Sequence, residues 1–148
     1  MRRLIAALLL TGGPACAAES NGAVMIAVDN VRNATGRVVV ELCTEQHFLT
    51  DDCDYHASAP ATAGRTLVLA PNVPPGVYAV QAFHDRNGNS KVDRGAFGRP
   101  LEGVGFSNDA RIGLSGPKFA KAGFRHGDAP QSIRLTLKHF TTRDGAVD

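Results

Sequence analysis

Hydrophobic and polar residues alternate along several short segments of this chain of 148 residues. Val24, Ile26 and Val28 occupy every second position, which is the period-two pattern of a half-buried strand. The segment after Asn33-Ala34-Thr35-Gly36 is rich in β-branched residues, which favour strands. On such patterns, strands are expected at residues 24–29, 37–42, 66–70, 77–83 and 133–139.

The segments between these strands carry turn residues. Residues 57–64 are small and polar and contain Pro60, so they predict a connection. Residues 72–76 contain Pro74-Pro75-Gly76 and predict a tight turn. Residues 95–116 are rich in glycine but also hold apolar side chains, so we expect an ordered long loop packed on the sheet with one short strand. Residues 117–124 predict a single helical turn.

No segment shows sustained helical periodicity, an internal repeat or a domain boundary. Short strands joined by turns are typical of a sandwich. The expected fold is all-β, an antiparallel β-sandwich of about seven strands, formed by one domain over residues 18–148.

The N-terminus has the pattern of a signal peptide over residues 1–17. Arg2 and Arg3 precede a short apolar run at residues 4–10, and Ala15-Cys16-Ala17 is a small-x-small cleavage site. We expect cleavage after Ala17 and a secreted or periplasmic protein. A lipoprotein acylated at Cys16 is the less favoured alternative, because residues 13–15 lack the aliphatic residue that such sites usually carry.

Charge excludes one class of partner. The chain has 16 basic and 14 acidic residues, and removal of Arg2 and Arg3 leaves 14 of each. A balanced chain without a basic cluster does not favour nucleic-acid binding. No further hydrophobic stretch is long enough to span a membrane.

Cys43 and Cys53 remain after signal removal and predict a disulfide, because the expected compartment is oxidising. A thiol-redox pair is the alternative, but nine residues separate these cysteines where redox sites have two.

Candidate metal chemistry lies directly after the strand at residues 77–83. Asp85, Asn87, Asn89 and Asp93 place side-chain oxygens at every second residue, and the backbone carbonyl of Lys91 fills the remaining step. Calcium takes six to eight oxygen ligands, and a loop with this spacing can direct them at one centre. The expected cofactor is therefore Ca²⁺, bound weakly and structurally.

The two loop carboxylates are few for a complete calcium site, so we expect a distal ligand, with Glu102 or Asp109 as candidates. Ala96 stands where an EF-hand has its closing glutamate. The alternative is an ordinary turn, because Asp and Asn side chains also bond nearby backbone. His84 could be a ligand or a base, but we favour a hydrogen-bonded orienting group.

Two other functions remain open from the sequence. A small hydrolase could use the Gly-rich loop as a cleft, with Ser107, His84 and Asp109 as a triad, although no catalytic motif places these residues. A carrier could line an apolar ligand site with four phenylalanines, although such residues are more often core. The phenylalanines are Phe97, Phe106, Phe119 and Phe124.

Residues 73–126 carry a family resemblance. The matching segments are Pro74-Pro75-Gly76-Val77-Tyr78-Ala79-Val80, His84-Asp85-Arg86-Asn87-Gly88-Asn89 through Asp93, Gly98-Arg99-Pro100-Leu101-Glu102-Gly103, Gly105-Phe106-Ser107-Asn108, and Gly116-Pro117-Lys118-Phe119 with Ala122 and Phe124. They resemble the uncharacterised secreted bacterial family called domain of unknown function 2141, which usually has glycine at the position of Ser90. The strand entry also looks like immunoglobulin/transthyretin-like sandwiches.

The resemblance implies a fold and a location and brings no activity. Together with the motifs, it favours a secreted, non-catalytic module with a calcium-stiffened loop, acting as a binding or envelope-associated accessory protein. Its partner would be an unidentified protein or envelope component, and the sequence does not set the oligomeric state.

Overall fold

The computed structural model describes residues 21–141. The predicted signal peptide and Cys16 lie outside these residues. The elements are β1 (Gly22–Val31), β2 (Arg37–Cys43), β3 (Tyr55–Pro60), β4 (Gly64–Val73), β5 (Gly76–Asp85), η1 (Ala96–Gly98), β6 (Val104–Phe106), η2 (Ser107–Asp109), α1 (Phe119–Ala122), β7 (Phe124–His126) and β8 (Gln131–Thr136).

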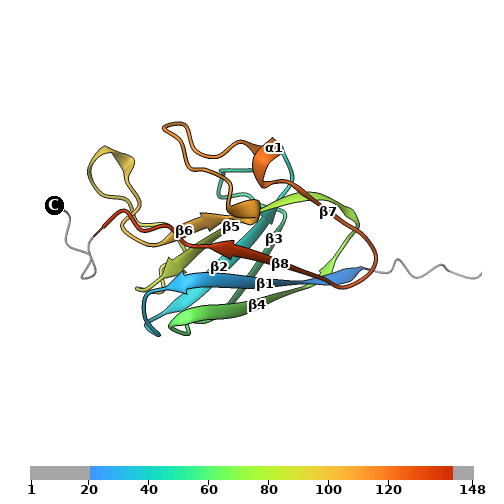
Figure 1. Ribbon diagram of the computed structural model, residues 1–148, viewed down its shortest axis with the longest axis horizontal. Coiled ribbons are helices and arrows are strands. Elements are labelled where there is room, and N and C mark those ends of the chain that lie inside the picture. The colour runs from blue at the N-terminus through green and yellow to red at the C-terminus, as the bar shows by residue number, and fades with distance from the viewer. Residues whose placement is uncertain (1–20, 142–148) are drawn as a thin grey trace, which may run out of the picture.

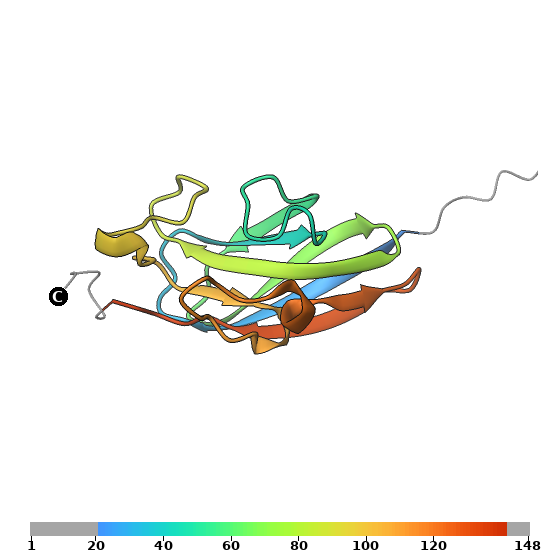
Figure 2. The same cartoon turned by 90° about the horizontal axis from the view of Figure 1, so that it is seen from above.

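The eight strands form two facing sheets, which confirms the predicted sandwich (Figures 1 and 2). The smaller sheet has the order β4-β1-β8. The larger sheet has the order β3-β2-β5-β6, and β7 pairs with the first part of β5. Two backbone hydrogen bonds between Val104 and Lys138 (3.0 and 2.7 Å) join the edge of the larger sheet to the segment after β8.

The core lies between the sheets and follows the alternation in the sequence. In β1 the side chains of Val24, Ile26 and Val28 are fully buried. Ile26 pairs with Val68 of β4 on one side and with Ile133 of β8 on the other. The fully buried Val38, Val40, Leu42 and Val80 face them from the larger sheet. Burial of alternate apolar side chains from both sheets is what stabilises a sandwich.

One pairing departs from the antiparallel expectation. β1 and β8 run parallel over six residue pairs, from Val24–Gln131 to Asp29–Thr136. A hairpin cannot connect parallel strands, and here the whole intervening chain lies between them. All other strand pairs are antiparallel.

The predicted connection at residues 57–64 is wrong over most of its length. Tyr55–Pro60 forms β3, an edge strand paired with β2. Tyr55, Ala57 and Ala59 pack against the core on alternate positions, although two of the three are small. Pro60 ends the strand at a sheet edge, where a missing N–H donor is tolerated.

The long loop after β5 is ordered, as predicted, and covers the outer face of the larger sheet. Val92 and Ile112 pack over Val39, Phe83 and Val104. Its short strand is β6, and α1 is the predicted helical turn. The segment from β6 to α1 continues the cover over Ala79, with Phe106 and Phe119 as its apolar contacts.

Candidate functional site

The candidate site begins at the end of β5, where Asp85 is fully buried. The Asp85 carboxylate accepts three backbone hydrogen bonds, from the N–H groups of Gly88 (2.8 Å), Asn89 (3.1 Å) and Ser90 (2.9 Å). A charged acceptor strengthens such bonds. Asp85 therefore fixes the first half of the loop around its own side chain.

The second half of the loop gathers around Asp93. The side-chain amides of Asn87 and Asn89 donate to the two oxygens of the Asp93 carboxylate at 2.6 and 2.8 Å. The amide oxygens of Asn87 and Asn89 accept from the backbone two residues on, at 3.2 and 2.9 Å. The amide nitrogens of Asn87 and Asn89 thus face Asp93, whereas their oxygens accept from nearby backbone, as expected for the ordinary-turn alternative.

Two residues of the loop adopt a left-handed backbone conformation, Gly88 with φ of 74° and Ser90 with φ of 61°. Glycine adopts this conformation without a steric cost, whereas serine does not. The turn therefore requires the left-handed conformation at Ser90 itself, and not only at Gly88.

Glu102 closes the loop from a distant point in the sequence. Its carboxylate is 4% exposed and accepts the backbone N–H groups of Arg86 (3.0 Å) and Asp93 (3.3 Å), one at each end of the loop. Burial raises the pKa of Glu102, and the charges of Asp93 and Asp85 raise it further, while the two backbone donors lower it. Three carboxylates thus interact at this loop.

Within the described residues, no basic side chain forms an ion pair with the three carboxylates at this loop. Residues 21–141 also contain no cluster of three or more His, Cys, Asp or Glu side chains arranged to hold a metal. The carboxylates of Asp85, Asp93 and Glu102 therefore do not surround one point, and a metal bound by all three would require the loop to rearrange. The Lys91 side chain is exposed, and its backbone N–H donates to Asn89.

The other distal candidate, Asp109, lies elsewhere. Its carboxylate accepts the backbone N–H of Thr136 at 2.7 Å and contacts the Thr136 hydroxyl at 3.4 Å. Asp109 therefore fastens η2 to the end of β8, and Glu102 alone of the two candidates contacts the loop.

The comparison with protein families covers both the sandwich and this loop. A family model described as "Uncharacterized protein conserved in bacteria (DUF2141)" matches residues 26–134. The chain belongs to this family. Neither a curated protein nor a solved structure matches the DUF2141 chain. No helix within residues 21–141 is long and apolar enough to cross a membrane.

His84 of the DUF2141 chain is buried beside the loop, and its Nε2 bonds to the backbone carbonyl of Thr35 at 2.7 Å. Burial lowers the His84 pKa, and the charge of Arg86 lowers it further. The hydrogen bond to Thr35 and the charge of Asp85 raise the pKa and partly offset this shift. This geometry is that of an orienting group, because the bond ties β5 to the turn between β1 and β2.

The three residues of the hypothetical triad contact different backbone segments. Ser107 is buried, and its hydroxyl accepts from the N–H of Val80 (2.8 Å) and donates to the carbonyl of Ala122 (2.6 Å). His84 bonds to Thr35, and Asp109 bonds to Thr136. Among the described residues, no hydrogen bond joins any two of the three. Ser107 serves as a buried bridge between β5 and α1.

The four phenylalanines of the carrier hypothesis do not line one site. Phe106 and Phe119 each make an edge-to-face contact with Phe48, with ring centres 5.8 and 5.6 Å apart. Phe124 packs against the core between the sheets, and Phe97 is fully exposed. Phe106 and Phe119 therefore pack against the disulfide loop through Phe48. No pattern in the sequence indicated this role for Phe48.

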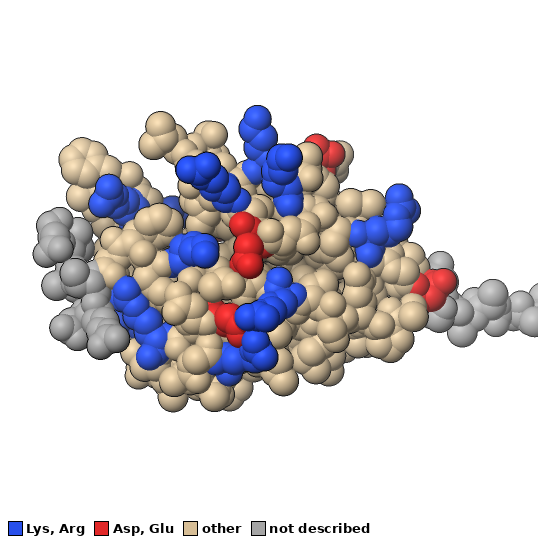
Figure 3. Space-filling view, viewed as in Figure 1, with Lys and Arg blue, Asp and Glu red and all other residues tan. Residues whose placement is uncertain are grey.

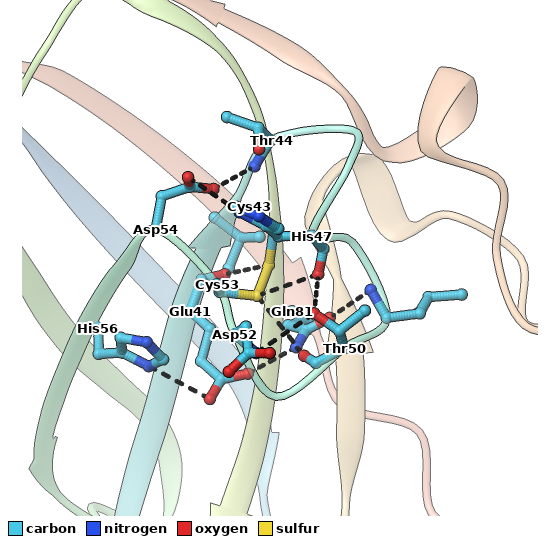
Figure 4. Close-up of a disulfide and its surroundings, with 12 residues drawn as sticks. Glu41, Cys43, Thr44, His47, Thr50, Asp52, Cys53, Asp54, His56 and Gln81 are labelled. Carbon is cyan, nitrogen blue, oxygen red and sulfur yellow. Dashed lines mark hydrogen bonds and ion pairs between the residues drawn. A yellow bond between two sulfur atoms is a disulfide. The ribbon is translucent and has the colours of Figure 1, made fainter.

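The predicted disulfide between Cys43 and Cys53 is confirmed, with a Cα–Cα distance of 4.5 Å (Figure 4). Polar contacts hold the loop that it closes. Asp54 accepts the backbone N–H of Thr44 at 2.7 Å and contacts His47 at 3.1 Å. Gln81 of β5 bonds to Glu41 (2.6 Å) and to the backbone carbonyl of Thr50 (3.0 Å), so the loop is fixed to the outer face of the larger sheet (Figure 4).

Proposed function

We propose that this DUF2141 protein is an exported, non-catalytic module in which the loop from Asp85 to Asp93, together with Glu102, binds one calcium ion. The ion would stiffen the surface beside the loop, and that surface would serve a binding or envelope-associated accessory role. The signal-peptide pattern at residues 1–17 supports export.

The observation that carries the calcium proposal is Glu102. A buried carboxylate is costly unless a cation or hydrogen bonds compensate it. Glu102 has two backbone donors but, within the described chain, no cationic side chain, and it interacts with the charges of Asp85 and Asp93. A divalent cation would balance this negative charge.

The remaining oxygen ligands are close at hand. A carboxylate oxygen that accepts one N–H still has a lone pair for a cation. The amides of Asn87 and Asn89 already meet the Asp93 carboxylate and would offer their oxygens after rotation. The Lys91 carbonyl would complete the loop ligands: Asp85, Asn87, Asn89, Lys91 and Asp93, with Glu102 as the distal one. Their low total charge suits a weak extracellular site, with a Kd on the order of 10⁻⁴ to 10⁻³ M.

Calcium titration of chelator-treated protein by calorimetry, with melting curves in the same buffers, tests this proposal. We expect one site and a melting temperature that rises with calcium, because binding only to the native state stabilises it. Glu102→Gln and Asp93→Asn should weaken binding at least tenfold. Asp109→Asn is the matched control, because it removes an acidic side chain outside the loop and should leave the affinity unchanged.

Asp85→Ala is a poorer variant because Asp85 also holds three backbone amides. The absence of binding heat, together with an unchanged melting temperature at about 10 mM calcium, well above the expected Kd, would overturn the calcium site.

A further inference from the structure

Two large apolar side chains project fully into solvent from neighbouring turns. Phe97 lies in η1, directly after the candidate calcium loop, and Leu114 lies between β6 and α1. In Figures 1 and 2 the two turns, drawn in gold and orange, lie along the same edge of the sandwich. Exposed apolar residues that are scattered singly are normal. Phe97 and Leu114 differ from the other exposed large apolar residues within residues 21–141 because their side chains lie wholly in solvent.

Both tips belong to turns with defined backbone bonds. The turn at Phe97 is closed by the Arg94–Pro100 bridge and by the Gly95 N–H donating to the Arg99 carbonyl at 2.9 Å. The turn at Leu114 is closed by the Gly116 N–H donating to the Gly113 carbonyl at 3.1 Å. These backbone bonds hold the two turns that carry Phe97 and Leu114.

The backbone at Phe97 adds a second cost. Its φ is 59°, in the left-handed region that glycine prefers. A phenylalanine there is strained, and with its ring in water it gains nothing from burial. Residues that are held in such conformations often have a role outside the isolated fold.

Basic side chains outnumber acidic ones along the chain segment that carries Phe97 and Leu114. Between residues 91 and 121 the chain has six basic side chains and three acidic ones. Of the acidic ones, Glu102 is buried, Asp93 accepts hydrogen bonds from two asparagine amides, and Asp109 accepts one from Thr136. Neutral donors do not cancel a carboxylate charge, so the segment has an excess of three basic side chains. The six basic side chains of this segment are all exposed; they are Lys91, Arg94, Arg99, Arg111, Lys118 and Lys121. Figure 3 shows that Lys and Arg side chains gather on the edge where the two turns lie.

We propose that this edge, defined by the turns at Phe97 and Leu114 and by the basic residues around them, docks on an anionic lipid bilayer. Apolar tips would enter the boundary between headgroups and acyl chains, and the basic side chains would stay at the level of the anionic headgroups. A protein partner is less well matched, because stable protein interfaces need a contiguous surface and these tips are isolated single side chains.

Vesicle sedimentation in the presence of a chelator tests this proposal separately from calcium binding. The probes are phosphatidylcholine vesicles with and without about 30% phosphatidylglycerol, a content chosen to give an anionic surface. We expect binding to the anionic vesicles only, weakened by added salt. The apolar run at residues 4–10 is present in the wild type and in every variant. Differences in vesicle binding among them therefore arise from the substituted residues.

The double variant Phe97→Ala/Leu114→Ala should lower the vesicle partition coefficient at least about tenfold, since two apolar side chains lose their burial. Arg99→Gln and Lys118→Gln should each lower it about fivefold. The matched control is Leu67→Ala/Leu69→Ala, which removes two half-exposed leucines from β4 in the other sheet and should change nothing.

Fluorescence gives a second measurement, because the chain has no tryptophan. In Phe97→Trp, the emission should shift to the blue when anionic vesicles are added, whereas in Leu67→Trp it should not. Wild-type protein that ignores anionic vesicles, or a Phe97→Ala/Leu114→Ala variant that binds them like the wild type, would overturn the proposal. Neither result would affect the calcium titration.

Discussion

Ser90 has a backbone conformation that the loop requires but that is sterically unfavourable for serine. Its N–H donates to the Asp85 carboxylate, so the loop needs its backbone in this position, yet its φ of 61° is costly for a residue with a Cβ atom. The alternating oxygens could be identified from the sequence because their spacing is explicit. The left-handed conformation at Ser90 could not, because the neighbouring Gly88 offered an equally good turn position.

Replacement of Ser90 by glycine should stabilise the protein. The change removes the steric cost of the left-handed conformation, which exceeds the extra flexibility that glycine gives the unfolded chain, so we expect a gain of about 0.5–1 kcal/mol. Urea unfolding in a chelator would measure it.

Gly88→Ala is the matched control, because Gly88 also has a positive φ and open space around it. It should destabilise by about 1 kcal/mol. A Ser90→Gly variant no more stable than the wild type would show that the loop relieves the strain in another way.

At the level of elements, β3 was the segment most poorly predicted from the sequence. Its inward residues Ala57 and Ala59 are too small to give a strong alternating pattern, and Pro60 indicated a connection. Its strand conformation comes from pairing with β2 and from the contact between the rings of Tyr55 and Tyr78, 5.8 Å apart. Such tertiary contacts override local preference and are invisible in a single sequence.

The disulfide loop between β2 and β3 supports a prediction at this scale. The double variant Cys43→Ala/Cys53→Ala should lose about 3 kcal/mol of unfolding free energy, because the open chain has more unfolded conformations. Urea unfolding of the oxidised wild type and the variant would measure the loss.

The control for the disulfide is a reducing agent, which should lower the stability of the wild type and leave the double variant unchanged. If the variant were as stable as the oxidised wild type, the bonds of Asp54 and Gln81 would be sufficient to hold the loop.

At the level of the whole molecule, histidines join segments that are far apart in the sequence. His139 Nε2 bonds to the carbonyl of Asn30 at 2.8 Å, and its ring lies against Gly103, where a Cβ atom would collide with it. Burial lowers the His139 pKa, the Asn30 contact opposes this, and Arg32, His84 and Arg86 lower it further. The uncharged ring thus suits the folded state.

This shift predicts how stability depends on pH. The folded pKa of His139 lies below the unfolded value, so the unfolded chain binds more protons between the two. The contribution of His139 should be complete above about pH 6.5 and be lost as the pH falls through the folded pKa. His84 should act in the same direction.

Urea unfolding between pH 5 and 8 (a range spanning the ordinary histidine pKa) would measure the effect. His139→Gln should reduce the loss of stability at low pH, and Lys138→Gln, at the adjacent position, should retain it. An equal loss in His139→Gln and the wild type would contradict the assignment to this side chain.

The sequence was informative about the sandwich as a whole because the core positions Val24, Ile26, Val28 and Leu135 alternate clearly. It also indicated Glu102 as a partner of the loop. It could not indicate that β1 and β8 are parallel neighbours, because alternation sets which face of a strand is buried and not which strands pair. Nor could it indicate that Phe97 and Leu114 share an edge, because they belong to turns without periodicity.

The parallel pair has a mechanical consequence. β1 begins at one end of the molecule and β8 finishes toward the other, so tension applied across the two chain ends pulls these adjacent strands along their length in opposite directions (Figure 1). This is a shear geometry, in which all six residue pairs bear the load together and do not separate one after another. A protein anchored at one terminus and loaded at the other would therefore resist extension through the seam between its first strand and its last.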